Sequence, residues 1–190
     1  MKLRGDTNYI VSGLERSGTS MMMQVLEAGG VPIAYSKSRK PDVHNPKGYY
    51  ELEGGKIINR LIQRNFPFES YRGTFIKITA YGLSYLPEGI YKIIYMERNL
   101  EEVLDSMETM AHITDKNREE TKQSFQRLNE KIKQELQTRE HTNVLYINYN
   151  DMLKDPHANL MKVCQFLESV TCDIRKMTAV VDGTLYRQRR

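Results

Sequence analysis

The sequence predicts an α/β fold of three layers, in which a mostly parallel central sheet is flanked by helices. Short apolar runs typical of buried strands alternate along the chain with segments of helical periodicity. No internal repeat or low-complexity linker interrupts this alternation. The 190 residues are enough for one sizeable core and few for two, so residues 1–190 are expected to form a single domain.

Four apolar runs are predicted to be strands, and the segments between them fit helices or loops. The strands are expected at residues 9–11, 75–78, 91–96 and 143–147. The helices are expected at 19–28, 51–64, 100–110, 117–139, 149–154 and 156–167, with a further helix opening the basic tail 173–190. Residues 31–49 contain three prolines and are predicted to be a long loop, and Asn99 is expected to cap the helix that follows it.

The composition indicates an ordered globular chain with a mild basic excess. Hydrophobic residues make up 39% and charged residues 27% of the chain. Lys and Arg total 28 against 24 Asp and Glu, which gives a net charge of +4. This excess suits an anionic ligand. A nucleic-acid partner is not expected, because it needs a stronger and more clustered basic surface.

Cys164 and Cys172 are the only cysteines in the sequence. A disulfide framework or a metal site needs more cysteines, or histidines at ligand spacing, so we expect two reduced thiols and no metal. No apolar run reaches the length of a signal-peptide core or a membrane span. We therefore expect a cytoplasmic protein.

The segment GLERSGTS, residues 13–20, lies between the first predicted strand and the first predicted helix. A Gly-rich turn in that position can wrap its backbone N–H groups around phosphate oxygens, assisted by the positive N-terminal end of the helix. Gly13 and Gly18 allow the tight turn, and Arg16 supplies a cation. Further donors are expected from the hydroxyls of Ser17, Thr19 and Ser20. The order of strand, loop, Arg and helix favours an anion site over a turn that only caps a helix.

The loop has the G-x-x-x-x-G spacing of a P-loop, but Thr19 stands where such a loop has its Lys. A second candidate anion site follows the strand at 91–96. Arg98 comes directly after this strand, at the carboxyl end where open α/β sheets bind ligands, and its guanidinium can bind a phosphate through two hydrogen bonds. Ser106 lies in the next predicted helix and offers a hydroxyl.

Residues 13–20 resemble the 5′-phosphosulfate loop of the sulfotransferase family, which has a basic residue followed by Ser-Gly-Thr. The segment YKIIYMERNLEEVLDS, at 91–106, resembles the 3′-phosphate element of that family, and residues 144–167 resemble its later strand-and-helix pattern. The likeness spans residues 9 to 167. It implies a fold similar to that of the P-loop-containing nucleotide hydrolases.

The resemblance implies a co-substrate, 3′-phosphoadenosine 5′-phosphosulfate (PAPS), whose product is 3′,5′-adenosine bisphosphate. Arg98 and Ser106 would hold the 3′-phosphate, distant from the loop. Arg16 would neutralise the leaving phosphate, and Lys77 would lie near the transferred sulfuryl group. A strand lysine whose head reaches solvent is an equal alternative for Lys77. Larger members of the family have a basic stretch near the C-terminus at the 3′-phosphate, but a solvated end fits this tail better: Arg187, Arg189 and Arg190.

The general base departs from the best-known pattern of the family. Members that sulfonate small phenols and steroids have a His two residues after the lysine, where this chain has Thr79. Other branches use a Glu that follows the first helix and loop, and Glu51 occupies such a place. The alternative for Glu51 is a first-turn helix residue favoured by the helix dipole. His44 and Glu53 are further candidates for the base.

The sequence therefore predicts transfer of a sulfuryl group from PAPS to a hydroxyl or amine of a small-molecule or glycan acceptor. No motif identifies the acceptor or the oligomeric state. Two alternatives stay open. A P-loop nucleotide kinase or NTPase would need the missing loop Lys and a metal-binding Asp at the end of a strand. A non-catalytic nucleotide-binding module would fit the short chain and the missing His.

Overall fold

The computed structural model describes residues 2–38, 40–43, 45–168 and 172–183. Its sheet has four parallel strands in the order β2-β1-β3-β4. The strands are β1 (Asn8–Gly13), β2 (Phe75–Lys77), β3 (Tyr91–Glu97) and β4 (Thr142–Asn148). The parallel sheet predicted from the alternation of strands and helices is confirmed.

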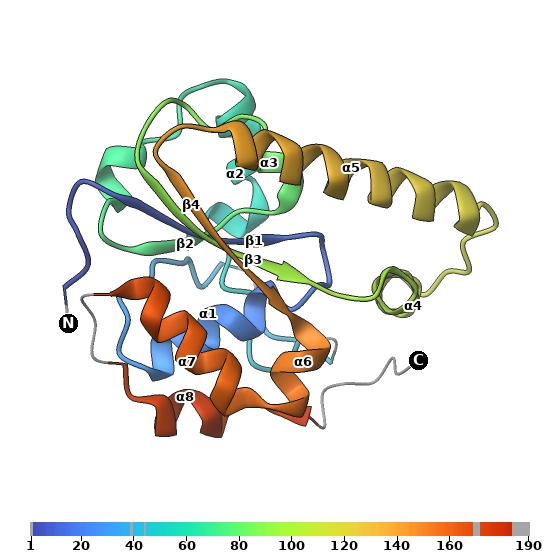
Figure 1. The fold of residues 1–190 in the computed structure, drawn as a ribbon. Helices are drawn as coiled ribbons and strands as arrows, with labels where there is room; N and C mark the ends of the chain where they lie inside the picture. The colour runs from blue at the N-terminus through green and yellow to red at the C-terminus, as the bar shows by residue number, and fades with distance from the viewer. Residues whose placement is uncertain (1, 39, 44, 169–171, 184–190) are drawn as a thin grey trace.

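Helices cover both faces of the sheet and give the three predicted layers (Figure 1). On the lower face in this view lie α1 (Thr19–Ala28), α6 (Tyr149–Lys154), α7 (Pro156–Leu167) and α8 (Ile174–Val180). On the upper face lie α2 (Ile57–Ile62), α3 (Ala80–Leu83) and α5 (Arg118–Thr138). The remaining elements are α4 (Leu100–Ala111), which follows β3, and two 3₁₀ helices, η1 (Glu53–Gly55) and η2 (Phe68–Tyr71).

The two hydrophobic cores arise because successive side chains of a strand point to opposite faces of the sheet. Val11 of β1 and Ile94 of β3 belong to the core shared with α1, α7 and α8. Ile10 and Ile93, one position earlier in each strand, belong to the core shared with α2, α3 and α5. All four side chains are fully buried, which explains why both strands are continuous apolar runs in the sequence.

The predicted boundaries agree with the structure to within two residues for most elements, but the helix predicted at 51–64 is not continuous. The chain forms η1 and then α2, and Glu51 precedes both, so it is not a first-turn helix residue. Gly54 and Gly55 interrupt the helix because their φ angles, 62° and 87°, lie in the left-handed region. The helix α3 was not predicted from the sequence, because it is too short to show helical periodicity.

Asparagine side chains begin the two helices that follow β3 and β4. Asn99 accepts a hydrogen bond from the backbone N–H of Glu101 at 2.9 Å, so the predicted cap of α4 is confirmed. Asn148 caps α6 by accepting from the backbone N–H groups of Asn150 and Asp151, at 2.9 and 3.1 Å. Because Asn148 is the last residue of β4 and Asn99 follows the end of β3 by two residues, each cap helps to fix how the chain turns at the carboxyl edge of the sheet.

The long charged helix α5 is held by apolar burial at its C-terminal end and by ion pairs at its N-terminal end. Ile132 and Leu136 are buried against the sheet, and Phe125 and Leu128 are partly buried. At the other end, Arg118 forms ion pairs with three carboxylates of α4 at 2.6 to 2.8 Å: Glu101, Asp105 and Glu108. The helix therefore connects the upper layer to α4, which borders the carboxyl edge of the sheet.

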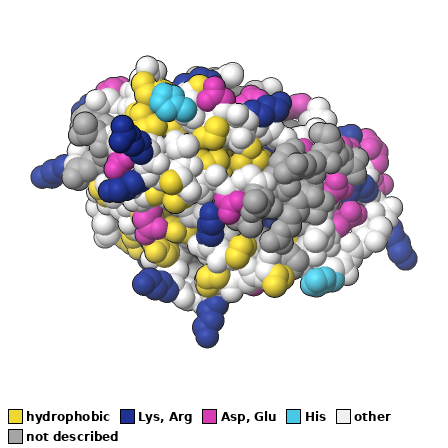
Figure 2. All heavy atoms as spheres, turned by 90° about the horizontal axis from the view of Figure 1, so that it is seen from below, with side chains coloured by type: hydrophobic (Ala, Val, Ile, Leu, Met, Phe, Trp, Pro, Cys, Tyr) yellow, Lys and Arg dark blue, Asp and Glu magenta, His cyan; other side chains and the backbone are white. Residues whose placement is uncertain are grey.

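The described surface has mixed charges on the face that carries α7 and α8, where basic and acidic side chains are interspersed (Figure 2). Within the described part of the chain, no helix combines the length and the hydropathy needed to cross a bilayer.

The two cysteines, Cys164 and Cys172, are free thiols. Burial raises the pKa of the Cys172 thiol to about 12.

Truncation of a side chain at the centre of the sheet should destabilise the fold strongly. Ile94 is fully buried in β3, so Ile94→Ala should lower the free energy of unfolding by about 3 kcal/mol through lost burial and the cavity left behind. Ile90 precedes the same strand and is 39% exposed, so Ile90→Ala should cost less than about 1 kcal/mol. Urea unfolding followed by circular dichroism measures both. Equal losses for the two variants would contradict the central position of β3.

Candidate active site

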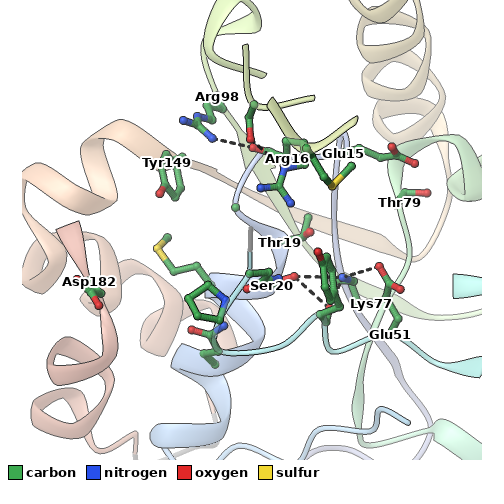
Figure 3. A pocket seen from close by; sticks show the side chains of 18 of the residues that line it. Glu15, Arg16, Thr19, Ser20, Glu51, Lys77, Thr79, Arg98, Tyr149 and Asp182 are labelled. Carbon is green, nitrogen blue, oxygen red and sulfur yellow. Dashed lines mark hydrogen bonds and ion pairs between the residues drawn. The ribbon is translucent and has the colours of Figure 1, made fainter. Parts of the chain in front are cut away.

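A cavity opens at the carboxyl edge of the sheet, beside the ends of β1, β2 and β3 (Figure 3). Its walls come from the loop between β1 and α1, from the segment 45–51, from α4, and from the ends of α6 and α8 that face this edge. Eight of the ten residues predicted for the site line it: Arg16, Gly18, Thr19, Ser20, Glu51, Lys77, Arg98 and Ser106. The other two, Gly13 and Ser17, are buried behind this lining.

The loop after β1 holds its shape through Gly13 and Ser17. The Ser17 hydroxyl and backbone N–H both donate to the carbonyl of Leu14, at 2.7 and 3.2 Å. A Cβ at Gly13 would overlap the carbonyl of Met96 on the neighbouring strand. Ser17 was expected to offer its hydroxyl to an anion, but in the structure that hydroxyl closes the turn and does not line the cavity.

Gly18 lets the loop pass close to the ring of Tyr149, which was not among the residues predicted for the site. Its φ angle is 100°, and a Cβ there would overlap the ring of Tyr149 at the start of α6. The same ring packs against the guanidinium of Arg98, with 4.6 Å between the Arg98 Cζ and the ring centroid. Burial raises the pKa of Tyr149, while the Arg98 cation acts in the opposite direction. The one available signal in the sequence was the position of Tyr149 as the first residue of the helix predicted at 149–154.

Arg16 and Arg98 lie at the same edge of the sheet and are joined directly. Arg98 Nη1 donates to the main-chain carbonyl of Arg16 at 3.0 Å, and Arg16 Nε donates to Ser106 Oγ at 2.9 Å. The two candidate anion sites were expected to be distant from each other. The structure instead connects the loop, the end of β3 and the second turn of α4 through these two hydrogen bonds.

Lys77 and Glu51 form a second polar group in the cavity, on the side away from Arg98 and Tyr149 (Figure 3). Lys77 Nζ lies 3.3 Å from Glu51 Oε1 and 3.2 Å from Ser20 Oγ, and it also donates to the carbonyl of Tyr49. The side chain of Lys77 is 5% exposed and that of Glu51 is 17% exposed. A strand lysine with its head in solvent is therefore excluded, and an ammonium faces a carboxylate inside the cavity.

Among the remaining candidates for the general base, Glu53 lies away from this cavity. Glu53 forms an exposed ion pair with Arg60 at 2.6 Å and is not part of the lining. Thr79 lines the cavity, whereas His44 and the tail arginines at 187, 189 and 190 lie outside the described residues. No group of three His, Cys, Asp or Glu side chains in the described ranges is arranged to hold a metal ion.

A contact of Lys47 with the chain at the end of α8, beside the cavity, was also not predicted from the sequence. Lys47 Nζ lies 3.2 Å from Asp182 Oδ2 and donates to the carbonyl of Val180 at the end of α8. Asn45 and Pro46 on one side, and Val180 and Asp182 on the other, contribute to the lining. The long loop 31–49 therefore meets the chain after α8 beside the cavity, two segments with no shared sequence pattern.

A parallel sheet with a glycine-containing loop and two arginines at its carboxyl edge defines a P-loop-like α/β protein. Within this class, the family model described as "Sulfotransferase domain" matches residues 6–180. The chain therefore belongs to the sulfotransferase domain family. No curated protein sequence matches it significantly.

Solved structures with the same fold include several sulfotransferases. The sulfotransferase domain of an olefin synthase from Synechococcus PCC 7002 superposes with a TM-score of 0.59 at 18% identity, over 95% of this chain and 79% of that one. A mouse sulfotransferase complexed with PAP gives 0.56 at 19% identity, over 98% and 67%. A retinol dehydratase in a complex with retinol and PAP gives 0.55 at 19% identity, over 96% of this chain, which spans 65% of that relative's length.

The close approach of Gly18 to Tyr149 should make this glycine less replaceable than others with a positive φ. Gly18→Ala adds both a strained φ and an overlap with the ring, so it should lower the free energy of unfolding by about 2 to 3 kcal/mol. Gly30 has a φ of 77° with open space around it, so Gly30→Ala should show the backbone cost alone, about 1 kcal/mol.

Thermal or urea unfolding of both glycine variants measures this difference. If Gly18→Ala costs no more than Gly30→Ala, Tyr149 does not pack against the loop in the way that the structure places it.

Proposed function

We propose that this protein transfers a sulfuryl group from PAPS to a hydroxyl or amine of a small-molecule or glycan acceptor. The observation that carries the proposal is the convergence of Arg16, Lys77 and Arg98 on one cavity at the carboxyl edge of the sheet. Membership of the sulfotransferase family and the PAP named in two neighbouring structures support PAPS as the donor. We further propose that residues 1–190 form one sulfotransferase-like domain. The expected cytoplasmic location stays a prediction.

The 5′ end of the donor fits the loop after β1. Backbone N–H groups of the loop and of the first turn of α1 can face phosphate oxygens, and that turn contains no acidic residue to oppose them. The hydroxyls of Thr19 and Ser20 line the same part of the cavity. The guanidinium of Arg16 can neutralise the charge that grows on the leaving phosphate as its bond to sulfur breaks.

The 3′-phosphate fits the side of the cavity away from Lys77 and Glu51, at Arg98 and Ser106. The position of Arg98 directly after β3 matches the general location of ligands in open α/β sheets. Arginine is protonated at any ordinary pH and binds phosphate in a planar, bidentate geometry. A nucleotide that carries both phosphates could therefore be told apart from one that carries only the 5′ group.

Glu51 and Lys77 are placed to act on the acceptor and on the sulfuryl group. In the transfer, an acceptor oxygen or nitrogen forms a bond to sulfur while the sulfur–oxygen bond to the 5′-phosphate breaks. Glu51 takes the proton that the acceptor loses, and Lys77 lies beside it to attract the negatively charged sulfuryl oxygens. Thr79, in the position of the family's histidine, has no basic group to fill that role.

A non-catalytic nucleotide-binding module is the second candidate function. It is favoured by the pairing of Glu51 with Lys77, since each of these side chains already satisfies the charge of the other. A kinase is not proposed, because Thr19 replaces the lysine that a P-loop directs at the β- and γ-phosphates.

Ligand-dependent stability should separate these functions. At a concentration of 100 times its dissociation constant, 3′,5′-adenosine bisphosphate should stabilise the protein by about 2.7 kcal/mol, which raises Tm by several degrees. 5′-AMP and ATP–Mg²⁺ at the same concentration should give smaller shifts. A larger shift with ATP–Mg²⁺ would overturn the proposal in favour of a kinase or NTPase. A shift with the bisphosphate but no transfer from PAPS to a broad acceptor panel would favour the non-catalytic module.

Arg16→Ala should reduce sulfuryl transfer by about 10²- to 10³-fold, because the leaving phosphate loses its cation. Circular dichroism should show the fold unchanged. Arg127→Ala is the matched control, because it removes an exposed arginine of α5 whose Nη2 donates to Gln123 Oε1 at 3.3 Å. A rate for Arg16→Ala equal to that of the control would remove Arg16 from the mechanism.

A further inference from the structure

Behind Arg98 lies a carboxylate that has no place in the cavity lining. Glu102, in the first turn of α4, is 0% exposed, and its Oε2 accepts a hydrogen bond from Arg98 Nε at 2.9 Å. Asn150 of α6 donates from Nδ2 to both carboxylate oxygens, at 3.1 and 3.3 Å. Glu102 therefore joins the end of β3, α4 and α6 within the protein interior.

Burial of this carboxylate needs an explanation beyond helix formation. An acidic residue in the first turn of a helix is favourable, but Glu101 already supplies one at the surface, where it pairs with Arg118 and Lys122. A fully buried charge is costly unless it is paired and hydrogen-bonded, as Glu102 is. An apolar residue at position 102 would avoid that cost, so the carboxylate must serve the group to which it is bound, Arg98.

The guanidinium of Arg98 is restrained by three contacts from different elements. Glu102 accepts from Nε, the carbonyl of Arg16 accepts from Nη1, and the ring of Tyr149 packs against its face. The Arg98 side chain is 7% exposed. Arginine loses much rotamer freedom when it binds a ligand, and a side chain that is already fixed avoids most of that loss.

We propose that Glu102 is a positioning residue of the nucleotide site. It fixes the Arg98 guanidinium in the orientation that binds the 3′-phosphate, and through Arg98 it holds the carbonyl of Arg16 in the phosphate loop. The inference rests on the proposed function, because it takes PAPS and the bisphosphate as the ligands of Arg98.

The direction in which phosphate affinity changes when Glu102 is removed distinguishes a positioning role from a purely electrostatic one. Arg98 stays protonated with or without a carboxylate beside it, so Glu102 is not needed to create the cation. The negative charge of Glu102 would by itself weaken the attraction of the site for phosphate. Its removal should therefore tighten phosphate binding if only charge matters, and weaken it if the orientation of Arg98 matters.

Glu102→Gln tests this difference with little change in volume. Because Asn150 Nδ2 faces both oxygens of Glu102, the amide nitrogen of a glutamine would meet another donor and the side chain would have to turn. Affinity for 3′,5′-adenosine bisphosphate, measured by calorimetry, should fall about tenfold, the loss expected for one hydrogen bond to a charged group. Affinity for 5′-AMP should change less than about threefold.

Glu101→Gln makes the same substitution one position earlier in α4, at the surface, and should leave both affinities unchanged. An unchanged or increased preference of Glu102→Gln for the bisphosphate would overturn the inference.

A double-variant comparison tests whether Glu102 acts through Arg98. Arg98→Ala should remove the preference for the bisphosphate, and Arg98→Ala with Glu102→Gln should show the same preference as Arg98→Ala alone. The double variant also leaves no uncompensated buried charge. A further tenfold loss in the double variant would mean that Glu102 acts by another route, which overturns the inference.

Asn150→Ala keeps the test available if circular dichroism finds that Glu102→Gln does not fold. This variant removes the second support of the Glu102 carboxylate and should cause a selective loss in the same direction, of about threefold. An unchanged preference would count against the inference. If the wild-type protein does not prefer the bisphosphate to 5′-AMP, the proposed function fails as well. A wild-type preference that survives in every variant except Arg98→Ala overturns the positioning role alone.

Discussion

The hydrogen bond from Arg98 Nη1 to the carbonyl of Arg16 joins the two segments on which the site depends. Arg16 has a φ of 65°, a left-handed conformation that costs energy for a residue with a Cβ. The bond to its carbonyl helps to hold that conformation. It can form because β1 and β3 are parallel neighbours with Gly13 opposite Met96, so their carboxyl ends emerge side by side.

The cavity gathers three cations, and each has a polar partner within the protein. Arg16 donates to Ser106, Lys77 pairs with Glu51, and Arg98 pairs with Glu102. Like charges confined at one edge of a sheet repel one another when they are partly removed from water. The two carboxylates reduce this repulsion, Glu51 from within the cavity and Glu102 from the interior behind Arg98.

Each of three strand ends contributes a different group to the cavity. β1 supplies the loop and its backbone donors, β3 supplies Arg98, and β2 ends in Lys77. The long loop after α1 returns to the same edge, so Glu51 meets Lys77 there. A parallel sheet brings all these ends to one side, which is why residues far apart in the chain share one cavity.

Much of the fold and part of the site could be predicted from local sequence. The strands were found because two-sided burial makes them continuous apolar runs, and the loop after β1 was found because its glycines and arginine lie within a few residues. The break at Gly54 and Gly55 was missed, since a helical stripe does not reveal glycines that adopt a left-handed φ. The short helix α3 was missed because it completes hardly more than one turn.

The sequence by itself determined the class of fold, the glycine-containing loop after β1 and the arginine after β3, because each depends on residues adjacent in the chain. Only the tertiary structure decided that Glu51 faces Lys77, that Gly18 packs against Tyr149 and that Glu102 is buried behind Arg98. Two of these contacts join segments far apart in sequence, and the burial of Glu102 depends on how α4 and α6 pack together. No local pattern contains that information.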